Sequence, residues 1–240
     1  DLSIVTTAIE QGEYMKVVQK AISLIYPDYE SRMKHVTHGM MRFASGKMSS
    51  RKGNVVAGDE LVRDAMEIVR EKMLEREFTD TERETIARQV AVAAVKYSIL
   101  KQATGGDIIY DFEKSISFEG DSGPYIQYTA VRAAAVLGRG EKEGIALSTL
   151  VPHEWQATAL EKYLYRFPEV VVRAYESLEP HHIATYLTEL SSQFNSLYAE
   201  HKIADAADAA SGYKLALTSA FHATLVQGLF LLGIQVPEKM

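Results

Sequence analysis

The segment Lys47-Met48-Ser49-Ser50-Arg51-Lys52-Gly53-Asn54 carries the side chains of this chain that are best suited to chemistry. From residue 31 to residue 58 there are six Lys and Arg and no Asp or Glu, although the whole chain holds 26 basic and 32 acidic side chains. Ammonium and guanidinium groups neutralise phosphate charge, hydroxyls donate to phosphate oxygens, and glycine lets the backbone come close. The segment therefore predicts a site for a polyanionic phosphate, with an ordinary solvated turn as the alternative.

Short elements in front of this segment would position it. Residues 2–6 are β-prone, residues 14–25 have apolar positions at helical spacing, and residues 35–43 are again compatible with a strand. A strand, a helix and a strand before a phosphate-facing loop suit the C-terminal half of a nucleotide-binding α/β sheet, where ligands meet the strand ends. There is no Walker sequence and no Gly-x-Gly-x-x-Gly, so a P-loop or a dinucleotide site has little support.

The chain after the loop is predicted to be helical. Asp59 is expected to cap one helix, and Thr81 with Glu84 predicts a capping box for a helix over 86–101 that ends at Gly105-Gly106. Residues 108–118 are expected to be more extended. Further amphipathic helices are predicted over 124–138, 152–166, 168–177, 180–201 and 213–233, and their short loops indicate antiparallel packing in a bundle. The expected fold class is mostly α with a small α/β part.

Composition narrows the class of protein. With 240 residues, 47% of them hydrophobic, the chain can form one large or two ordinary domains. There is no cysteine, which excludes disulfides and thiolate catalysis. No apolar run approaches the roughly 18 residues of a membrane span, and no signal peptide is visible, so a cytoplasmic protein without a membrane partner is expected. Because the chain starts at Asp1 rather than Met, we expect a fragment or a processed product.

Charge is unevenly distributed between the two halves. Residues 116–240 hold 9 basic and 14 acidic side chains, against 17 and 18 in residues 1–115. If the second half binds nucleic acid, stacking and hydrogen bonding must therefore dominate over general attraction to phosphate.

Two stretches carry a resemblance to a known family. Residues 35–41 followed by 46–54 resemble the second signature of class I aminoacyl-tRNA synthetases, the KMSKS loop. Residues 111–132, with Gly-Pro-Tyr-x-Gln-Tyr-x-x-x-Arg over 123–132, closely resemble arginyl-tRNA synthetases, as does the chain end from Gly228 to Met240. The similarity runs over essentially the whole chain.

The resemblance implies both a fold and a reaction. Residues 1–115 would be the C-terminal part of a class I Rossmann-like catalytic domain with its connecting helices. Residues 116–240 would be a helical anticodon-binding domain of the DALR type. In the intact enzyme, arginine would be activated with ATP and transferred to its tRNA. ATP is then a substrate that enters with Mg²⁺, no tightly bound cofactor is expected, and the protein is expected to be a monomer.

The same resemblance assigns roles to individual residues. The catalytic set, which acts on the leaving pyrophosphate, is Lys47, Ser49, Ser50, Arg51 and Lys52. The residues expected to bind ATP are His38, Gly39, Met40 and Lys47, and Gln11 is expected to bind the arginine side chain. The residues expected to bind tRNA are Tyr125, Tyr128, Tyr198 and Met240. No metal ligands are expected, since His35 and His38 lack companions.

The sequence departs from the family pattern at three points. The loop reads Lys-Met-Ser-Ser-Arg, so Ser50 stands at the second lysine of KMSKS, and Lys214 stands where the family often has an arginine. The other ATP signature, HIGH, is absent, and the pair His181-His182 is not that motif. We therefore expect these 240 residues alone not to form arginyl-adenylate. A non-catalytic tRNA-binding module and a fragment of another class I synthetase are the alternatives.

Overall fold

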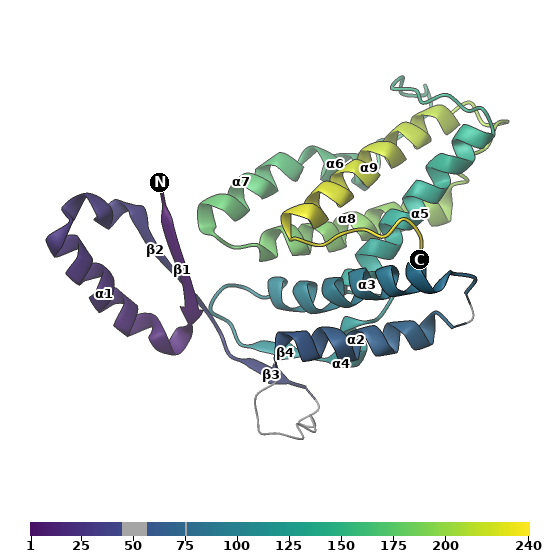
Figure 1. Cartoon of the computed structure of the whole chain (residues 1–240). Helices are drawn as coiled ribbons and strands as arrows, with labels where there is room; N and C mark the ends of the chain where they lie inside the picture. Colours follow the sequence, from purple (N-terminus) through teal and green to yellow (C-terminus); the bar gives the residue numbers. More distant parts are fainter. Residues whose placement is uncertain (45–56, 75) are drawn as a thin grey trace.

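The computed structural model describes residues 1–44, 57–74 and 76–240. In these residues it consists of α-helices with two short parallel sheets (Figure 1). The expected fold class, mostly α with a small α/β part, is confirmed. None of the described helices has the length and apolar character needed to cross a membrane.

The first element group is a small βαβ unit. Strand β1 (Ser3–Ala8) passes through the 3₁₀ turn η1 (Ile9–Gln11) into α1 (Gly12–Ile25). A second 3₁₀ turn, η2 (Pro27–Arg32), leads into β2 (Met33–His38), which runs parallel to β1 in a register from Ser3↔Met33 to Ala8↔His38. The carboxyl ends of both strands therefore lie at one edge. We call residues 3–38 the α1 lobe.

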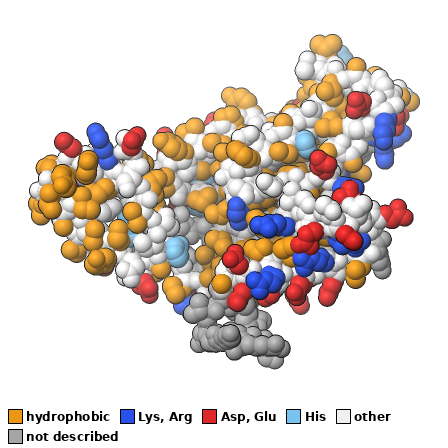
Figure 2. Space-filling view, viewed as in Figure 1, with side chains coloured by type: hydrophobic (Ala, Val, Ile, Leu, Met, Phe, Trp, Pro, Cys, Tyr) orange, Lys and Arg blue, Asp and Glu red, His pale blue; other side chains and the backbone are white. Residues whose placement is uncertain are grey.

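The α1 lobe has no apolar core of its own. The predicted helix is present, but its apolar side chains point outward: Tyr14, Val17 and Ile25 are 64%, 68% and 69% exposed. The one buried residue of α1 is Ser23. Figure 2 shows hydrophobic side chains gathered over this lobe. The amphipathic pattern thus predicted the helix correctly, while the apolar stripe is not covered by any described part of this chain.

The strand predicted over 35–43 is interrupted at Gly39-Met40. Its first part is β2, and its second part is β3 (Met41–Phe43), which pairs in parallel with β4 (Ile108–Tyr110) in a different sheet. Beyond β4 the extended segment predicted over 108–118 gives way to the short helix α4 (Phe112–Ser115). This happens because the Asp111 side chain caps the helix by accepting a hydrogen bond from the Lys114 N–H at 3.2 Å.

Helices α2 (Gly58–Lys72) and α3 (Asp80–Leu100) lie side by side (Figure 1). Both capping predictions for them were wrong. The N-cap of α2 is Ala57, with Asp59 inside the first turn, and the capping box of α3 joins Thr79 to Glu82. Glu84 instead accepts two hydrogen bonds from the Arg70 guanidinium, at 3.0 and 2.9 Å. Also, α3 ends at Leu100, before the Gly105-Gly106 pair.

The remaining helices form the predicted bundle. They are α5 (Gly123–Lys142), α6 (Ala159–Tyr165), α7 (Phe167–Ser177), α8 (His181–Glu200) and α9 (Ser211–Leu231). The helix predicted over 152–166 starts only at Ala159, because Thr158 and Glu161 form a capping box there. In the bundle core the rings of Phe194 and Phe221 stack at 4.1 Å, and both are fully buried.

Helix α3 contributes to two cores. Ala87, Ala91 and Ala94 pack in the core that α3 forms with α2. Ala93 and Tyr97, on another face, pack in the core of the bundle. Small side chains permit close approach here, since a Cβ on Gly123 of α5 would lie 2.3 Å from the Ala93 carbonyl oxygen. The helix therefore joins the sheet region to the bundle.

Candidate functional site

The first part of the candidate site is the strand edge at the ends of β1 and β2. Ala8 and His38 are register partners, so the residues that follow them begin side by side. Gln11 ends the η1 turn after β1 and is exposed, while His38, Gly39 and Met40 follow directly at the end of β2. The structure therefore places Gln11, His38, Gly39 and Met40 at the carboxyl edge of one parallel strand pair. They are four of the five residues predicted to bind arginine and ATP, and the fifth, Lys47, lies outside the described residues. Ligands of α/β proteins bind at such edges.

A cavity of about 1040 Å³ opens beside this edge. His38, Gly39 and Met40 line it together with the loop after α3 and residues of α7 and α8, whereas Gln11 does not. Gly39 itself is buried, and a Cβ there would lie 2.1 Å from the Gly106 carbonyl oxygen. A glycine is therefore required at this position by the close approach of the 103–107 loop.

Several polar groups at this edge are already used within the chain. The Met40 N–H donates to Asp107 Oδ1 at 3.0 Å, and the Met40 carbonyl accepts from the Ile108 N–H at 3.0 Å. His38 Nδ1 donates to the Gly39 carbonyl at 2.9 Å, which leaves Nε2 as an acceptor. A ligand at this edge would accordingly meet the 46%-exposed Met40 side chain and His38 Nε2 rather than the Met40 backbone.

The predicted phosphate segment lies outside the described residues. This applies to Lys47, Ser49, Ser50, Arg51 and Lys52. The neighbouring elements are described, and they are β3 before the segment and α2 after it.

The second part of the candidate site is a group of aromatic and polar side chains on α5 and α8. The Arg132 guanidinium lies 4.8 Å from the ring centroid of Tyr128 and 5.2 Å from that of Tyr198. Arg132 Nη1 donates to Asn195 Oδ1 at 2.7 Å, and Asn195 Nδ2 donates to the Tyr125 hydroxyl at 2.8 Å. We call these five residues the α5–α8 cluster. Three of them are the tyrosines predicted to bind tRNA.

Helical periodicity explains why these residues meet. Positions 125, 128 and 132 lie on one stripe of α5, and positions 195 and 198 on one stripe of α8. Arg132 and Asn195 were not predicted as site residues, although Arg132 ends the singled-out stretch 111–132 and Asn195 stands three positions before the predicted Tyr198. Tyr198 is 42% exposed, so one ring of the cluster remains open to a base.

Met240, the fourth residue predicted to bind tRNA, packs elsewhere. It lies against the core between α2 and α3, and its carbonyl oxygen accepts a hydrogen bond from Arg76 Nη1 at 2.7 Å. Phe118 packs against the same core and meets the Tyr128 ring edge-on at 6.4 Å. Phe118 thus contacts both the cluster and the core on which Met240 packs.

A hollow of about 250 Å³ adjoins Tyr198. Its lining includes Arg139 of α5 together with His201 and Lys202, which follow α8. Arg139 and Lys202 are exposed at this hollow, and Lys202 also forms an ion pair with Asp205 at 3.1 Å. Cations beside an aromatic ring suit a nucleotide, whose base stacks while its phosphate accepts hydrogen bonds.

A buried polar network fixes the segment that leads into α5. The Tyr97 hydroxyl of α3 hydrogen-bonds both Asp121 and Thr188. Burial, followed by the hydrogen bond to Asp121, raises the pKa of Tyr97. For Asp121, burial acts to raise the pKa, but hydrogen bonds from Tyr97 and Lys101 outweigh it and hold the pKa below its ordinary value. The carboxylate therefore stays charged and holds the N-terminus of α5 between α3 and α8.

Lys214, which replaces the arginine common in the resembling family, has a structural position. Its Nζ donates to Asp208 Oδ2 at 2.6 Å, and its side chain is only 8% exposed. A single ammonium satisfies this buried contact, so the bidentate geometry of arginine is not needed here.

Two family models together match most of the chain. The model described as "tRNA synthetases class I (R), catalytic domain" matches residues 1–112, and the model described as "DALR anticodon binding domain" matches residues 126–240.

Curated relatives carry one name. The chain is 33% identical to the arginine–tRNA ligase of Lactobacillus johnsonii over 239 residues, which are 100% of this chain and 42% of that protein. It is 32% identical to the arginine–tRNA ligase of Pyrococcus furiosus, covering 100% of this chain and 40% of that protein. The chain thus spans about two fifths of the length of these relatives.

Solved structures have the same arrangement. The arginyl-tRNA synthetase of Thermus thermophilus matches with a TM-score of 0.82 and 29% identity, over 100% of this chain and 41% of that one. The arginyl-tRNA synthetase of Plasmodium falciparum matches with a TM-score of 0.76, over 99% of this chain and 41% of that one; at 20% identity it supports the fold alone.

Proposed function

We propose, from the premise that this chain belongs to the arginyl-tRNA synthetase family, that it supplies two working parts of such an enzyme. Residues 1–115 contribute part of the catalytic domain, and residues 116–240 form the anticodon-binding domain. The activity of the intact enzyme is the ATP-dependent joining of arginine to its tRNA, with Mg²⁺ entering alongside ATP and no tightly bound cofactor. We place this activity in the cytoplasm.

The reaction has two steps. In the first, the arginine carboxylate attacks the α-phosphorus of ATP, which forms arginyl-adenylate and releases pyrophosphate. In the second, a ribose hydroxyl of the terminal adenosine of the tRNA attacks the arginyl carbonyl carbon, and AMP leaves. Neither step requires a covalent nucleophile from the protein, so positioning and electrostatic stabilisation supply most of the acceleration.

The residues of the first half have roles in the activation step. Lys47, Arg51 and Lys52 neutralise the charge that develops on pyrophosphate, and Ser49 and Ser50 donate hydrogen bonds to it. His38, Gly39 and Met40 contact ATP at the end of β2. Gln11 follows β1 at the same edge, where its amide oxygen accepts from the guanidinium of the substrate arginine.

The observation that carries the tRNA-binding role is the α5–α8 cluster. Its five residues present three aromatic rings and one guanidinium plane, held in place by the Arg132–Asn195–Tyr125 hydrogen bonds. Bases splayed out of an anticodon loop stack on such faces, at about 1–3 kcal/mol for each base. Phe118 extends the aromatic surface toward Met240, the remaining residue that we assign to tRNA contact.

Binding of an arginine-acceptor tRNA to the 240-residue chain, followed by fluorescence anisotropy, tests this role. Tyr198→Ala is expected to weaken binding by about fivefold to a hundredfold, because one stacked base is lost. Tyr165→Ala is the matched control, since Tyr165 lies on α6 with 83% of its surface exposed and outside the cluster. Equal effects of the two substitutions would reject the cluster as the tRNA site.

The activation step needs a separate test. The isolated chain is expected to show no arginine-dependent ATP–pyrophosphate exchange. In a longer enzyme that contains these residues, Lys47→Ala and Arg51→Ala are expected to slow exchange by about 10²–10³-fold with unchanged tRNA affinity. Robust exchange by the isolated chain would contradict the proposed division of the ATP site. A longer enzyme that binds tRNA but lacks any exchange activity would favour the tRNA-binding module.

A further inference from the structure

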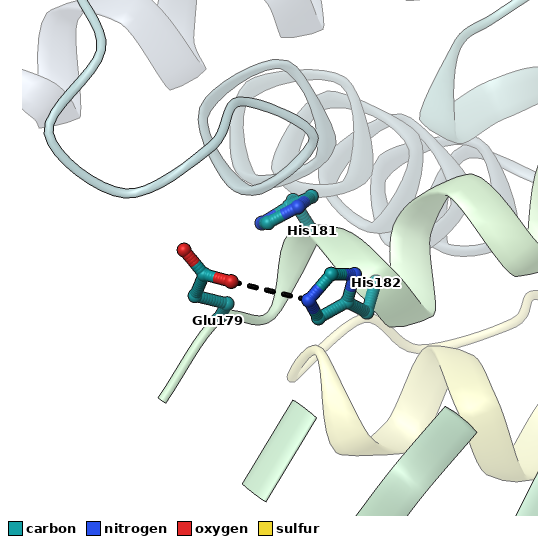
Figure 3. A group of neighbouring side chains, drawn as sticks. All are labelled: Glu179, His181 and His182. Atoms are coloured by element: carbon teal, nitrogen blue, oxygen red, sulfur yellow. Dashed lines mark hydrogen bonds and ion pairs between the residues drawn. The ribbon is translucent and has the colours of Figure 1, made fainter. Parts of the chain in front are cut away.

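The turn between α7 and α8 gathers two imidazoles and a carboxylate (Figure 3). Helix α7 ends at Ser177, and its C-cap Leu178 adopts the left-handed conformation with φ 58°. The Glu179 N–H then donates to the Ala174 carbonyl at 3.0 Å. Pro180 is the N-cap of α8, whose first residue is His181. This tight reversal brings the Glu179 side chain back toward His181 and His182.

The three side chains are close enough to share a ligand. His182 Nε2 lies 3.1 Å from Glu179 Oε2, and the ring centroids of His181 and His182 are 4.1 Å apart. One possible ligand atom from each of the three residues lies within 4.8 Å of the other two.

One of these atoms has no hydrogen-bond partner. His181 Nδ1 is buried and makes no hydrogen bond within the described part of the chain. A buried imidazole nitrogen without a partner is uncommon, and a missing ion is one standard explanation. An imidazole nitrogen without a hydrogen-bond partner can offer its lone pair to a metal ion.

We propose that Glu179, His181 and His182 bind a divalent transition-metal ion of the zinc type, with water completing the coordination. Two imidazoles and one carboxylate suit Zn²⁺ and its neighbours, whereas Mg²⁺ and Ca²⁺ prefer oxygen ligands alone.

The required geometry is near to that observed. With metal–ligand bonds of about 2.0–2.2 Å, neighbouring ligand atoms in a tetrahedral site are about 3.3 Å apart. Glu179 and His182 are already 3.1 Å apart, so a ring nitrogen of His181, now within 4.8 Å of both, is the atom that has to come closer. The Arg173 guanidinium is the nearby charge that opposes a cation, and the Glu179 carboxylate offsets it.

The site would lie where the bundle faces the α1 lobe. A hollow of about 350 Å³ is lined on one side by Lys34 and His35 of β2 and on the other by Leu178 and Glu179 of the turn. A metal ion would lock the turn that forms one wall of this hollow. The inference is independent of the proposed tRNA and ATP sites, none of whose residues it uses.

Titration of the metal-free, untagged 240-residue chain with Co²⁺, read by visible absorption, tests the proposal. We expect one Co²⁺ for each chain, with absorption bands that Zn²⁺ removes by displacement. Glu179→Gln, His181→Asn and His182→Asn are each expected to lower the Co²⁺ affinity by about tenfold or more. His153→Asn is the matched control because His153 is exposed and distant in sequence, and it should bind like the unchanged chain.

Circular dichroism of each variant without metal shows whether the variant is folded. Glu179→Gln preserves the shape of the side chain and should fold normally. Saturable Zn²⁺ should also raise the Tm of the unchanged chain and of His153→Asn but not that of Glu179→Gln. Binding that is absent, or that is equal in the three variants and in the control, would overturn the proposal. Full affinity in His181→Asn would likewise overturn it.

Discussion

Apolar side chains of the helices are buried in the bundle and exposed in the α1 lobe. In the bundle, Phe194, Phe221 and Leu225 are fully buried against one another's helices. In the α1 lobe, Val17 and Leu24 are 68% and 74% exposed on a helix of comparable regularity. Apolar periodicity thus determines that a helix forms and which face is apolar, whereas the partner that covers this face must be supplied separately. In the bundle, neighbouring helices of the described chain cover the apolar faces, whereas no described residues cover the apolar face of α1.

The largest expected difference between the two regions is in core stability. Phe194→Ala is expected to destabilise the chain by about 3–5 kcal/mol, because it removes a fully buried ring and leaves a cavity beside Phe221. Val17→Ala should change stability by about 0.5 kcal/mol or less, since the side chain is exposed. Urea unfolding followed by circular dichroism measures both. Similar losses for the two variants would mean that Val17 is covered in solution.

The next largest loss of stability is expected at Gly39, where the chain leaves the α1 lobe. Gly39→Ala should cost about 1–3 kcal/mol, because its Cβ would lie 2.1 Å from the Gly106 carbonyl oxygen and must displace the backbone. Gly58→Ala is the control, since no atom of the described residues lies within 4 Å of the added Cβ, and it should be neutral or stabilising by up to about 1 kcal/mol. Thermal unfolding of the two variants measures the difference in their stability. An unaffected Gly39→Ala would show that the 103–107 loop yields easily.

Ion pairs in the bundle and in the α1 lobe are also expected to contribute differently to stability. Asp208→Asn should cost about 1–2 kcal/mol, because it leaves the nearly buried Lys214 ammonium with only a weak contact to the Lys202 carbonyl. In the α1 lobe Glu13→Gln should cost about 0–0.5 kcal/mol, since Glu13 and Lys16 are 87% and 71% exposed. Denaturant unfolding at pH 7 measures the free energy of unfolding of both variants.

The acid dependence of the Lys214–Asp208 pair has a definite sign. The hydrogen bonds from Lys214 and from the Ala210 N–H lower the pKa of Asp208 below its ordinary 3.8. A lowered pKa stabilises the fold above pH 3.8, and this contribution is lost as the pH falls through the lowered value. The stability gap between the unchanged chain and Asp208→Asn should therefore close in acid. A gap that stays constant down to pH 3 would contradict the assignment.

The smallest expected effect concerns salt. The second half carries 9 basic and 14 acidic side chains, so tRNA binding there depends on few phosphate contacts. Raising the salt from about 50 to 200 mM should weaken tRNA binding by about tenfold or less, as for one or two neutralised phosphates. A much steeper dependence, measured by anisotropy, would assign the binding to the basic residues 31–58 instead of the bundle.

Much of the fold was accessible from the sequence because it rests on local periodicity. The helices of the bundle and the shared stripe of Tyr125 and Tyr128 on α5 follow from helical spacing, whereas Tyr198 of α8 was grouped with them only through the family resemblance. The start of α3 at Asp80 did not, since Thr79–Glu82 and Thr81–Glu84 are equally good capping boxes by sequence, and the tertiary contact of Glu84 with Arg70 decides between them.

The pairing of Glu179 with the two histidines was missed for a different reason. It depends on the left-handed conformation of Leu178, and a leucine does not predict this conformation because side chains other than glycine rarely adopt it. The roles of Gln11, His38 and Met40 remain predictions, because their positions at one strand edge are compatible with a ligand site without specifying the ligand.

The two faces of α3 determine where the chain can be divided. The proposed division of labour lies between residues 115 and 116, yet Ala93 and Tyr97 belong to the interior of the bundle, and Met240 closes the core between α2 and α3. A polypeptide that began at residue 116 would lack the backbone of α3 at Ala93, against which Gly123 packs. An autonomous unit that contains the bundle therefore begins before α3, and we expect unfolding of the bundle to be coupled to that of α2 and α3.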